Sequence, residues 1–266
     1  MTFMAGSNDA TLKRFRTLDQ DLLLEGENLD VLPTLPDRAF DLIYIDPPFN
    51  TGREQVRGER RYADAFDDYP GFLRPRLVHA RRLLAEHGTL YVHVDPRESH
   101  YVKVLLDGLF GRECFLNEIV WAYDYGGRTK RRWPPKHDTI LVYVRDPERY
   151  WFDIEAVERE PYIAPGLQKS AERAARGKTP TSVWWHTIVP TTSREKTGYP
   201  TQKPEGVVRR IVAASSRPGG WCLDFFAGSG TLGAVCRPLG RRFVLIDSNP
   251  DAIRIARQRL GVIDNH

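Results

Sequence analysis

An apolar run that ends in an acid and two prolines constrains the fold of this chain more than any other feature. Residues 40–45 have the composition of a strand buried on both faces of a parallel sheet, and Asp46-Pro47-Pro48-Phe49 follows directly. Open α/β sheets bind ligands beyond the carboxyl ends of such strands. The prolines fix φ and lack N–H groups, so the motif offers a carboxylate, rigid carbonyl acceptors and an aromatic face. It predicts a site for a planar ring with an exocyclic amine, and an ordinary Pro-rich turn is the alternative.

A second strand, near the other end of the chain, runs into a glycine-rich turn. Residues 223–231 read Leu-Asp-Phe-Phe-Ala-Gly-Ser-Gly-Thr, and the glycines allow the backbone to approach a bound ligand closely. A further strand, 242–246, ends in Asp247, a suitable acceptor for ribose hydroxyls. Asn249 and Pro250 then mark the start of the last helix. This part of the chain is predicted to bind a cofactor that contains a ribose.

A nicotinamide dinucleotide is the rival cofactor. Gly228, Gly230 and Gly233 fit the fingerprint G-x-G-x-x-G, and Asp247 lies at roughly the expected offset of about 20 residues. Two considerations count against this reading. The motif at 46–49 would have no role, and we expect the residues after Asp247 to be too few for the remaining strands of a dinucleotide fold.

Length and charge distribution suggest how the chain is organised. The 266 residues suffice for one large α/β domain with an inserted subdomain. The net charge of +4 arises in residues 121–200, which hold 14 Lys and Arg against 10 Asp and Glu, whereas the other residues balance. The same segment holds five of the six tryptophans. Basic and aromatic residues together favour a surface that reads nucleic acid, and a solvated region with its own small core is the alternative.

Cysteine and histidine usage gives no sign of a metal site. Cys114, Cys222 and Cys236 lack C-x-x-C spacing and suit a reduced, cytoplasmic protein. The seven histidines show no ligand spacing, and His93 is interpreted as structural. Residues 1–11 lack the apolar core of a signal peptide, and no stretch approaches a membrane span. We therefore expect a cytoplasmic protein without a metal.

Alternating strand and helix patterns predict a doubly wound α/β fold. The expected strands are 22–24, 40–45, 89–94, 116–122, 139–144, one entering the glycine turn at 223, and 242–246. The expected helices are 29–32, 73–84 with Gly88 as its C-cap, 102–109, 171–175, one from 202 through 212, and 250–260. Residues 50–68 are interpreted as a mobile loop beside the site.

Taken in order, these motifs resemble those of the beta class of DNA amino-methyltransferases that use S-adenosylmethionine (SAM), of the adenine-N6 type. In this class the catalytic motif precedes the target-recognition region and the SAM loop comes last. The resemblance covers most of residues 20–125 and 197–261. It implies a doubly wound, Rossmann-like methyltransferase sheet with permuted motif order. Residues 1–120 and 201–266 would form the catalytic and SAM-binding domain, and 121–200 an inserted DNA target-recognition region.

The resemblance also assigns site residues. The catalytic motif comprises Asp46, Pro47, Pro48 and Phe49. The implied SAM-binding residues are Glu27, Lys203, Pro204, Asp224, Phe226, Ala227, Gly228, Ser229, Gly230, Thr231, Asp247 and Ser248. Glu27 stands where the family commonly has Asp, and Ser248 where it often has an apolar residue. Within the basic segment, the candidates for DNA contacts are Arg128, Lys130, Arg131 and Arg132.

The implied reaction moves the methyl group of SAM to the N6 amine of an adenine flipped out of double-stranded DNA. Asp46 is typical of N6 enzymes, whereas cytosine-N4 enzymes usually carry Ser there, so cytosine N4 is the alternative. Methylation at cytosine C5 needs a thiolate, usually in a Pro-Cys pair that this sequence lacks. A non-catalytic DNA-binding subunit is the alternative from another class. A companion restriction endonuclease, a homodimer and a nucleoid-associated place in a prokaryote or phage stay open.

Overall fold

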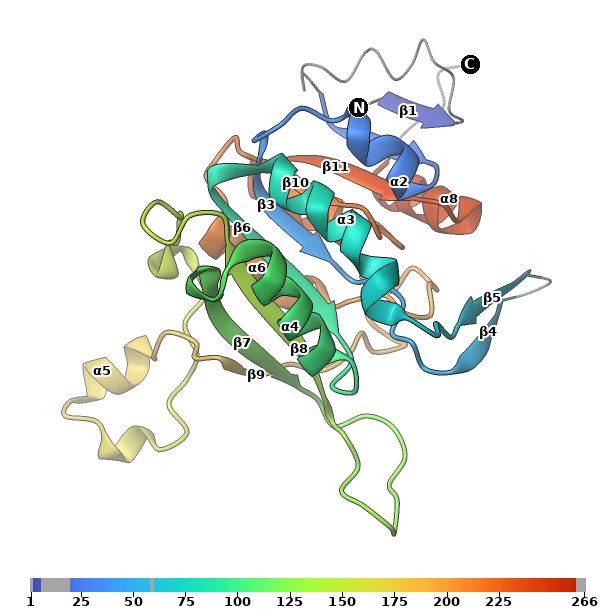
Figure 1. Ribbon diagram of the computed structural model, residues 1–266. Coiled ribbons are helices and arrows are strands. Elements are labelled where there is room, and N and C mark those ends of the chain that lie inside the picture. Colours follow the sequence, from blue (N-terminus) through green and yellow to red (C-terminus); the bar gives the residue numbers. More distant parts are fainter. Residues whose placement is uncertain (1, 6–19, 58–59, 262–266) are drawn as a thin grey trace.

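The computed structural model describes residues 2–5, 20–57 and 60–261 and places nine strands in one mixed sheet, in the order β1-β2-β11-β10-β3-β6-β8-β7-β9 (Figure 1). The strands are β1 Thr2–Ala5, β2 Leu22–Glu25, β3 Phe40–Ile45, β6 Leu84–Val94, β7 Phe115–Ala122, β8 His137–Val144, β9 Val183–Trp185, β10 Trp221–Asp224 and β11 Arg242–Asp247. A separate antiparallel hairpin consists of β4 Arg53–Arg57 and β5 Arg60–Asp64. The helices are α2 Asn28–Val31, α3 Tyr69–Leu83, α4 Ser99–Phe110, α5 Ala171–Arg176, α6 Glu205–Ser215, α7 Thr231–Cys236 and α8 Pro250–Arg259. Short 3-10 turns are η2 Leu32–Thr34, η3 Arg112–Cys114, η4 Ile154–Ala156 and η5 Pro165–Leu167.

The direction in which the chain winds reverses between β3 and β10, in the middle of the sheet. The strands from β1 to β6 in the sheet order run parallel. From β3 the chain crosses to β6 on one side, and from β10 it crosses to β11 on the other. Ligands bind at the carboxyl ends of the strands where such a sheet switches direction. The two motifs found in the sequence follow β3 and β10, so the fold brings them together there.

The sheet is covered by helices on both faces, as β3 shows. Ile43 and Ile45 belong to one apolar core with residues of α3 and α4, whereas Leu42 and Tyr44 belong to another with residues of α6, α7 and α8. Successive strand residues point to opposite faces, so a strand covered twice requires a continuous apolar run. In Figure 1, α3 and α4 lie across the near face of the sheet.

The predicted doubly wound α/β fold is confirmed, with one addition. The strands β7 and β8 pair antiparallel, and β8 also runs antiparallel to β6, so this end of the sheet is mixed. The last helix begins as predicted, with Pro250 in its first turn and the Asn249 side chain accepting a hydrogen bond from the Asp251 N–H at 3.0 Å.

Two local predictions are wrong. Residues 50–68 contain the β4–β5 hairpin, a pairing that their low apolar content did not reveal. Gly88 lies inside β6 and does not cap α3, because the chain turns extended at Leu84 and enters the strand at once. A Cβ at Gly88 would lie 2.8 Å from the carbonyl oxygen of Phe40. The glycine is therefore needed for the close approach of β3 and β6.

The boundaries of the predicted insert remain a prediction. Residue 121 lies within β7, and β8 and β9 extend the main sheet. None of the described helices is both long and apolar enough to cross a membrane.

Replacing Gly88 with Ala is expected to destabilise the protein by about 1–3 kcal/mol, because the methyl group overpacks the contact between β3 and β6. The matched control is Gly108→Ala in α4, where a Cβ meets nothing within 4 Å and helix propensity should add about 0.5–1 kcal/mol of stability. Thermal unfolding of both variants measures the difference. Equal unfolding temperatures would contradict the assigned role of Gly88.

Candidate active site

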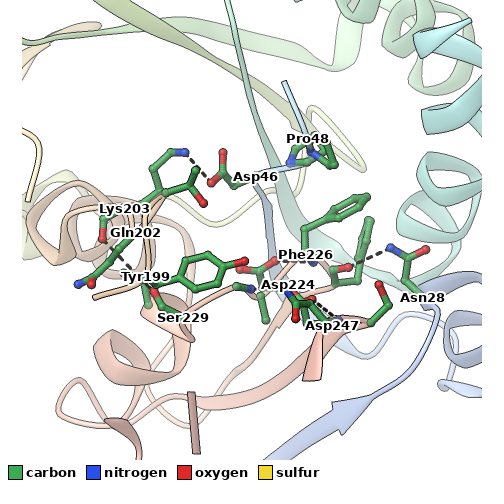
Figure 2. Close-up of a pocket in the computed structure, with 18 of the residues that line it drawn as sticks. Asn28, Asp46, Pro48, Tyr199, Gln202, Lys203, Asp224, Phe226, Ser229 and Asp247 are labelled. Atoms are coloured by element: carbon green, nitrogen blue, oxygen red, sulfur yellow. Dashed lines mark hydrogen bonds and ion pairs between the residues drawn. The ribbon is translucent and has the colours of Figure 1, made fainter. Parts of the chain in front are cut away.

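A cavity of about 920 Å³ lies at the edge of the sheet where the parallel strands end (Figure 2). Its walls come from the turns after β2, β3, β10 and β11, from α3, and from residues 199–203 ahead of α6. The residues that the family resemblance assigns to catalysis and cofactor binding all line it, except Pro204 and Gly230. In the described part of the chain, no group of three or more His, Cys, Asp or Glu is placed to hold a metal ion.

Among the residues that the structure describes, hydrogen-bond partners reach only one oxygen of the Asp46 carboxylate. The Lys203 ammonium donates to Oδ2 at 2.6 Å, the contact dashed in Figure 2, and lies 4.6 Å from the centre of the Phe49 ring. The other oxygen, Oδ1, is buried and accepts no hydrogen bond from any residue that the structure describes. A carboxylate can accept about four hydrogen bonds, and an unsatisfied buried oxygen is costly. Asp46 is therefore poised to accept a donor that a ligand supplies.

The rest of the motif forms the wall around Asp46. Pro47, Pro48 and Phe49 line the cavity. The Phe49 ring lies 5.7 Å from the imidazole of His93, which is fully buried in β6 and hydrogen-bonded to Tyr44 and Asp138. The Nδ1 atom of His93 is 3.9 Å from Asp46 Oδ1. The sequence-based interpretation of His93 as structural missed this contact with the candidate catalytic residue.

The glycine turn after β10 is held by the acid at the end of β11. Asp247 accepts hydrogen bonds from the N–H of Gly228 at 2.7 Å and of Asn249 at 2.8 Å. Gly228 has a φ of 50°, and a Cβ there would lie 3.2 Å from the ring of Tyr199. Only glycine fits this turn without strain, so the backbone at Gly228 borders the cavity with no side chain in between.

The two assigned residues outside the cavity support its loops. Gly230 has a φ of 72°, and a Cβ there would lie 2.9 Å from the Cβ of Ala256, so it allows α7 to pack on α8. Pro204 immediately precedes the first residue of α6. The carbonyl of Lys203 accepts a hydrogen bond from the Thr231 hydroxyl at 3.3 Å, which joins this segment to α7.

Arg76 of α3 is a site residue that sequence reasoning missed. Its guanidinium pairs with Glu27 at 2.7 Å and donates to the Asn28 side chain at 2.8 Å. The Asn28 amide in turn donates to the carbonyl of Phe225 at 3.0 Å (Figure 2). These contacts fix the turn after β2 against the turn after β10. The helical spacing indicates that position 76 is buried. Its partners Asn28 and Glu27 lie 48 and 49 residues away, so no local sequence pattern indicates that Arg76 belongs to the site.

Asp224, at the end of β10, is buried beside two other carboxylates. Burial raises the pKa of Asp224 well above its ordinary value of 3.8, and the charges of Asp46 and Asp247 act in the same direction. The Phe226 N–H, which donates to Oδ1 at 2.9 Å, and the Lys203 ammonium lower it. The net upward shift means that the described residues compensate the negative charge incompletely. A positively charged ligand group in the cavity would complete the compensation.

The candidate DNA contacts lie outside the cavity, on the loop that joins β7 to β8. Arg128, Lys130, Arg131 and Arg132 are all exposed there. Trp133 on the same loop is 95% exposed, which is unusual for so large an apolar side chain. The base of the loop is closed by Lys136, whose ammonium donates to the Tyr125 carbonyl at 2.6 Å. Since β7 and β3 end at the same edge of the sheet, this loop and the β4–β5 hairpin both extend from the edge that holds the cavity (Figure 1).

The comparisons with known proteins agree with this geometry. The family model N6_N4_Mtase, described as DNA methylase, matches residues 40–258. The chain is 31% identical over 243 residues to the Type II methyltransferase M.HpaI of Haemophilus parainfluenzae, covering 91% of this chain and 74% of the relative. It is 31% identical over 254 residues to the DNA adenine methyltransferase YhdJ of Escherichia coli (strain K12), covering 92% and 84%. The solved structure of PvuII DNA methyltransferase (cytosine-N4-specific) shares the fold, with a TM-score of 0.68 and 15% identity over 91% of this chain and 86% of that one.

Replacing Asp224 with Asn is expected to stabilise the free protein at neutral pH. Because folding raises the pKa of the Asp224 carboxyl, the folded protein loses stability as the pH rises above about 4. The amide of Asn at this position does not ionise and avoids that loss. We expect a gain of about 1–3 kcal/mol at pH 8, the cost of an incompletely compensated buried polar group, that shrinks toward pH 4. Thermal unfolding across this pH range measures it.

Asp41 supplies a control of opposite sign. Burial would raise its pKa, but hydrogen bonds from Arg217 and His87 lower it overall, so its ionised form contributes stability above about pH 4 that is lost as the pH falls. Asp41→Asn should therefore destabilise the protein at pH 8. The same response in both variants would contradict the electrostatic account of Asp224.

Proposed function

Because the chain belongs to the N6_N4_Mtase family of DNA methylases, we propose that it is a SAM-dependent DNA (adenine-N6) methyltransferase. In this proposal it moves the methyl group of SAM to the N6 amine of an adenine flipped out of duplex DNA. The observation that carries the proposal is the incompletely hydrogen-bonded carboxylate of Asp46, in a cavity that it shares with the glycine turn after β10.

The residues around Asp46 suit activation of an aromatic amine. Such an amine is a poor nucleophile because its lone pair is delocalised into the ring. Asp46 can accept one amine N–H and the Pro47 carbonyl the other, which favours a pyramidal nitrogen with a localised lone pair. Phe49 offers a face on which the flipped base stacks. The contacts strengthen as the amine becomes cationic, so they stabilise the transition state more than the bound substrate.

The cavity has the charge and shape that SAM requires. When bound, SAM supplies an electrophilic methyl group on a positively charged sulfur. The carboxylates of Asp46, Asp224 and Asp247 suit a ligand that carries an ammonium and a sulfonium. The backbone at Gly228 can approach the ligand closely, and Asp247 stands at a strand end where ribose hydroxyls are commonly bound.

Two observations favour adenine over cytosine as the target. The first position of the motif is Asp46, which the family resemblance associates with N6 enzymes, and the relative YhdJ is named a DNA adenine methyltransferase. The PvuII enzyme is named cytosine-N4-specific, but at 15% identity it is related to this chain by fold alone. Transfer to cytosine N4 is the second candidate, because that amine is conjugated to its ring in the same way.

Duplex DNA is the proposed partner, and an adenine must leave the base stack to reach the cavity. The exposed cations of the β7–β8 loop supply charge for phosphates at the edge of the cavity, and Trp133 supplies a ring for contact with bases. The Type II name of M.HpaI favours a companion restriction endonuclease for this chain as well. A homodimer, and residence beside DNA in the cytoplasm, remain predictions.

Substitution of Asp46 by Ala should lower single-turnover methyl transfer by a factor on the order of 10²–10³, the usual loss when a transition-state contact is removed. Binding to DNA should be unchanged. Phe49→Ala is the comparison and should lose less, since stacking on a flipped base contributes about 1–3 kcal/mol. Mass spectrometry of nucleosides from treated duplex DNA identifies the product. N6-methyladenine is expected; N4-methylcytosine would overturn the base assignment, and full activity in Asp46→Ala would overturn the mechanism.

Replacing Arg128, Lys130, Arg131 and Arg132 together with Ala should weaken DNA binding. If all four contact phosphates, the slope of log K against log salt should fall by about 3–4, and SAM affinity should not change. The matched control replaces the exposed cations Lys169, Arg173 and Arg176 on and beside α5. Binding titrations over a range of salt measure the slope. A reduced slope in the control but not in the loop variant would move the DNA surface away from the β7–β8 loop.

A further inference from the structure

We infer that His93 is the proton acceptor of the reaction and takes the proton of the target amine by way of Asp46. The inference rests on the proposed function, because it concerns the amine that Asp46 is proposed to bind. Its basis is a chain of polar contacts that leads from the cavity into the protein. Asp46 lines the cavity, His93 lies behind it, and Asp138 lies behind His93.

The imidazole is fixed in this chain by contacts at both of its nitrogens. Nδ1 lies 3.0 Å from the hydroxyl of Tyr44 and 3.9 Å from Oδ1 of Asp46. Nε2 lies 3.0 Å from Oδ2 of Asp138, whose other oxygen accepts the hydroxyl of Tyr123 at 2.9 Å. The ring itself is completely buried. The three strands β3, β6 and β8 therefore align Asp46, His93 and Asp138 in one row.

The hydrogen-bond distances fit a ring that carries a proton on Nε2 and can accept another at Nδ1. Burial would raise the pKa of Asp138, but the hydrogen bonds from His93 and Tyr123 and the charge of Lys203 act in the opposite direction and its pKa is lowered overall, so Asp138 is ionised and acts as an acceptor. The proton of the ring is therefore on Nε2. Burial raises the pKa of Tyr44, so its hydroxyl stays protonated and can donate to Nδ1. Nδ1 also lies 3.9 Å from Asp46 Oδ1.

A purely structural histidine would make the hydrogen bonds with Tyr44 and Asp138 and have no part in the reaction. Two observations point beyond that role. Asp46 Oδ1, the atom turned toward His93, has no hydrogen-bond donor among the residues that the structure describes. The ring of Phe49, at 5.7 Å, and that of Trp121, at 5.5 Å, pack against the imidazole and cover it, so the proton path between Asp46 and His93 lies away from bulk water.

The proton balance of the reaction gives His93 its task. As the nitrogen–carbon bond forms, the carbon–sulfur bond breaks with its electron pair left on sulfur, and the amine nitrogen must lose one proton. Asp46 accepts that proton from the amine and passes it from Oδ1 to Nδ1 of His93. Oδ1 must approach Nδ1 by about 1 Å to reach hydrogen-bond distance, a tightening common when substrates bind. The Tyr44 hydroxyl turns away to free the nitrogen.

The charges on either side drive the proton inward. Once Asp46 has passed the proton on, its carboxylate is again paired with the Lys203 ammonium at 2.6 Å. Asp138 stabilises the imidazolium that forms on His93. Imidazole is also a stronger base than a carboxylate. Five titratable groups among the described residues surround His93. They are Tyr44 on β3, Asp46 just after β3, Asp138 on β8, Tyr123 just after β7 and Lys203 ahead of α6.

The test replaces His93 with Gln, which can still donate to Asp138 and accept from Tyr44 but cannot take a proton. Single-turnover methyl transfer to duplex DNA is measured from pH 5.5 to 9. We expect a loss on the order of 10²-fold at neutral pH, the lower end of general-base effects, with SAM and DNA affinities unchanged. The variant should also lose the dependence of the rate on pH that a titrating base imposes.

Two further variants separate proton transfer from packing. Tyr44→Phe removes the hydroxyl on Nδ1 but keeps the base, and should lose less activity than His93→Gln. Asp138→Asn removes the charge behind the ring, which disfavours the imidazolium, so the rate of methyl transfer should fall. Nitrogen NMR of the histidine ring in the free protein gives a readout besides activity. A proton on Nε2 is expected, and a neutral ring protonated on Nδ1 instead would overturn the inference.

The outcomes also distinguish this inference from the proposed function. If the wild-type protein transfers methyl groups and His93→Gln matches its rate and pH profile, the proton path through His93 is wrong and the function stands. If the wild-type protein transfers no methyl group to any DNA, the proposed function fails and the inference fails with it.

Discussion

The site depends on one ion pair, between Lys203 and Asp46. The ammonium binds one carboxylate oxygen at 2.6 Å, and the other oxygen is turned toward His93 at 3.9 Å. The two residues are 157 positions apart in the sequence and meet because the segment ahead of α6 passes the carboxyl end of β3. The Lys203 charge also lowers the pKa of Asp224 and of Asp138. One cation thus offsets three carboxylates, which lie just after β3, on β8 and at the end of β10.

The remaining negative charge of the site favours binding of a cationic ligand and lowers the stability of the free protein. Asp224 keeps a raised pKa in spite of Lys203, which indicates that the site is electrostatically incomplete without a ligand. Functional sites commonly hold such unfavourable groups, because a residue selected for a bound state need not suit the free state. The same reasoning explains why the buried Oδ1 of Asp46 is tolerated without a hydrogen-bond donor among the described residues.

The sequence predicts those parts of the structure that leave a local pattern. The run at residues 40–45, the glycine turn and the Asn249-Pro250 helix start each predict an element that the structure contains, because strand burial, positive φ and capping are local requirements. The role of Gly88 and the β4–β5 hairpin were mispredicted, since both depend on strand pairing. The contact of His93 with Asp46 likewise depends on the alignment of β3 with β6, which no local pattern records.

A crystal structure of the chain with duplex DNA and S-adenosylhomocysteine, which has no methyl group to transfer, tests the central claim most directly. The measured quantity is the distance from the carboxylate of Asp46 to the nearest exocyclic amine of the DNA. The account predicts an adenine outside the helix with its N6 at hydrogen-bond distance, about 2.7–3.2 Å, from Asp46 and its ring against Phe49. An adenine that remains stacked in a fully bound duplex, or a flipped base whose amine is bound by other residues, would contradict it.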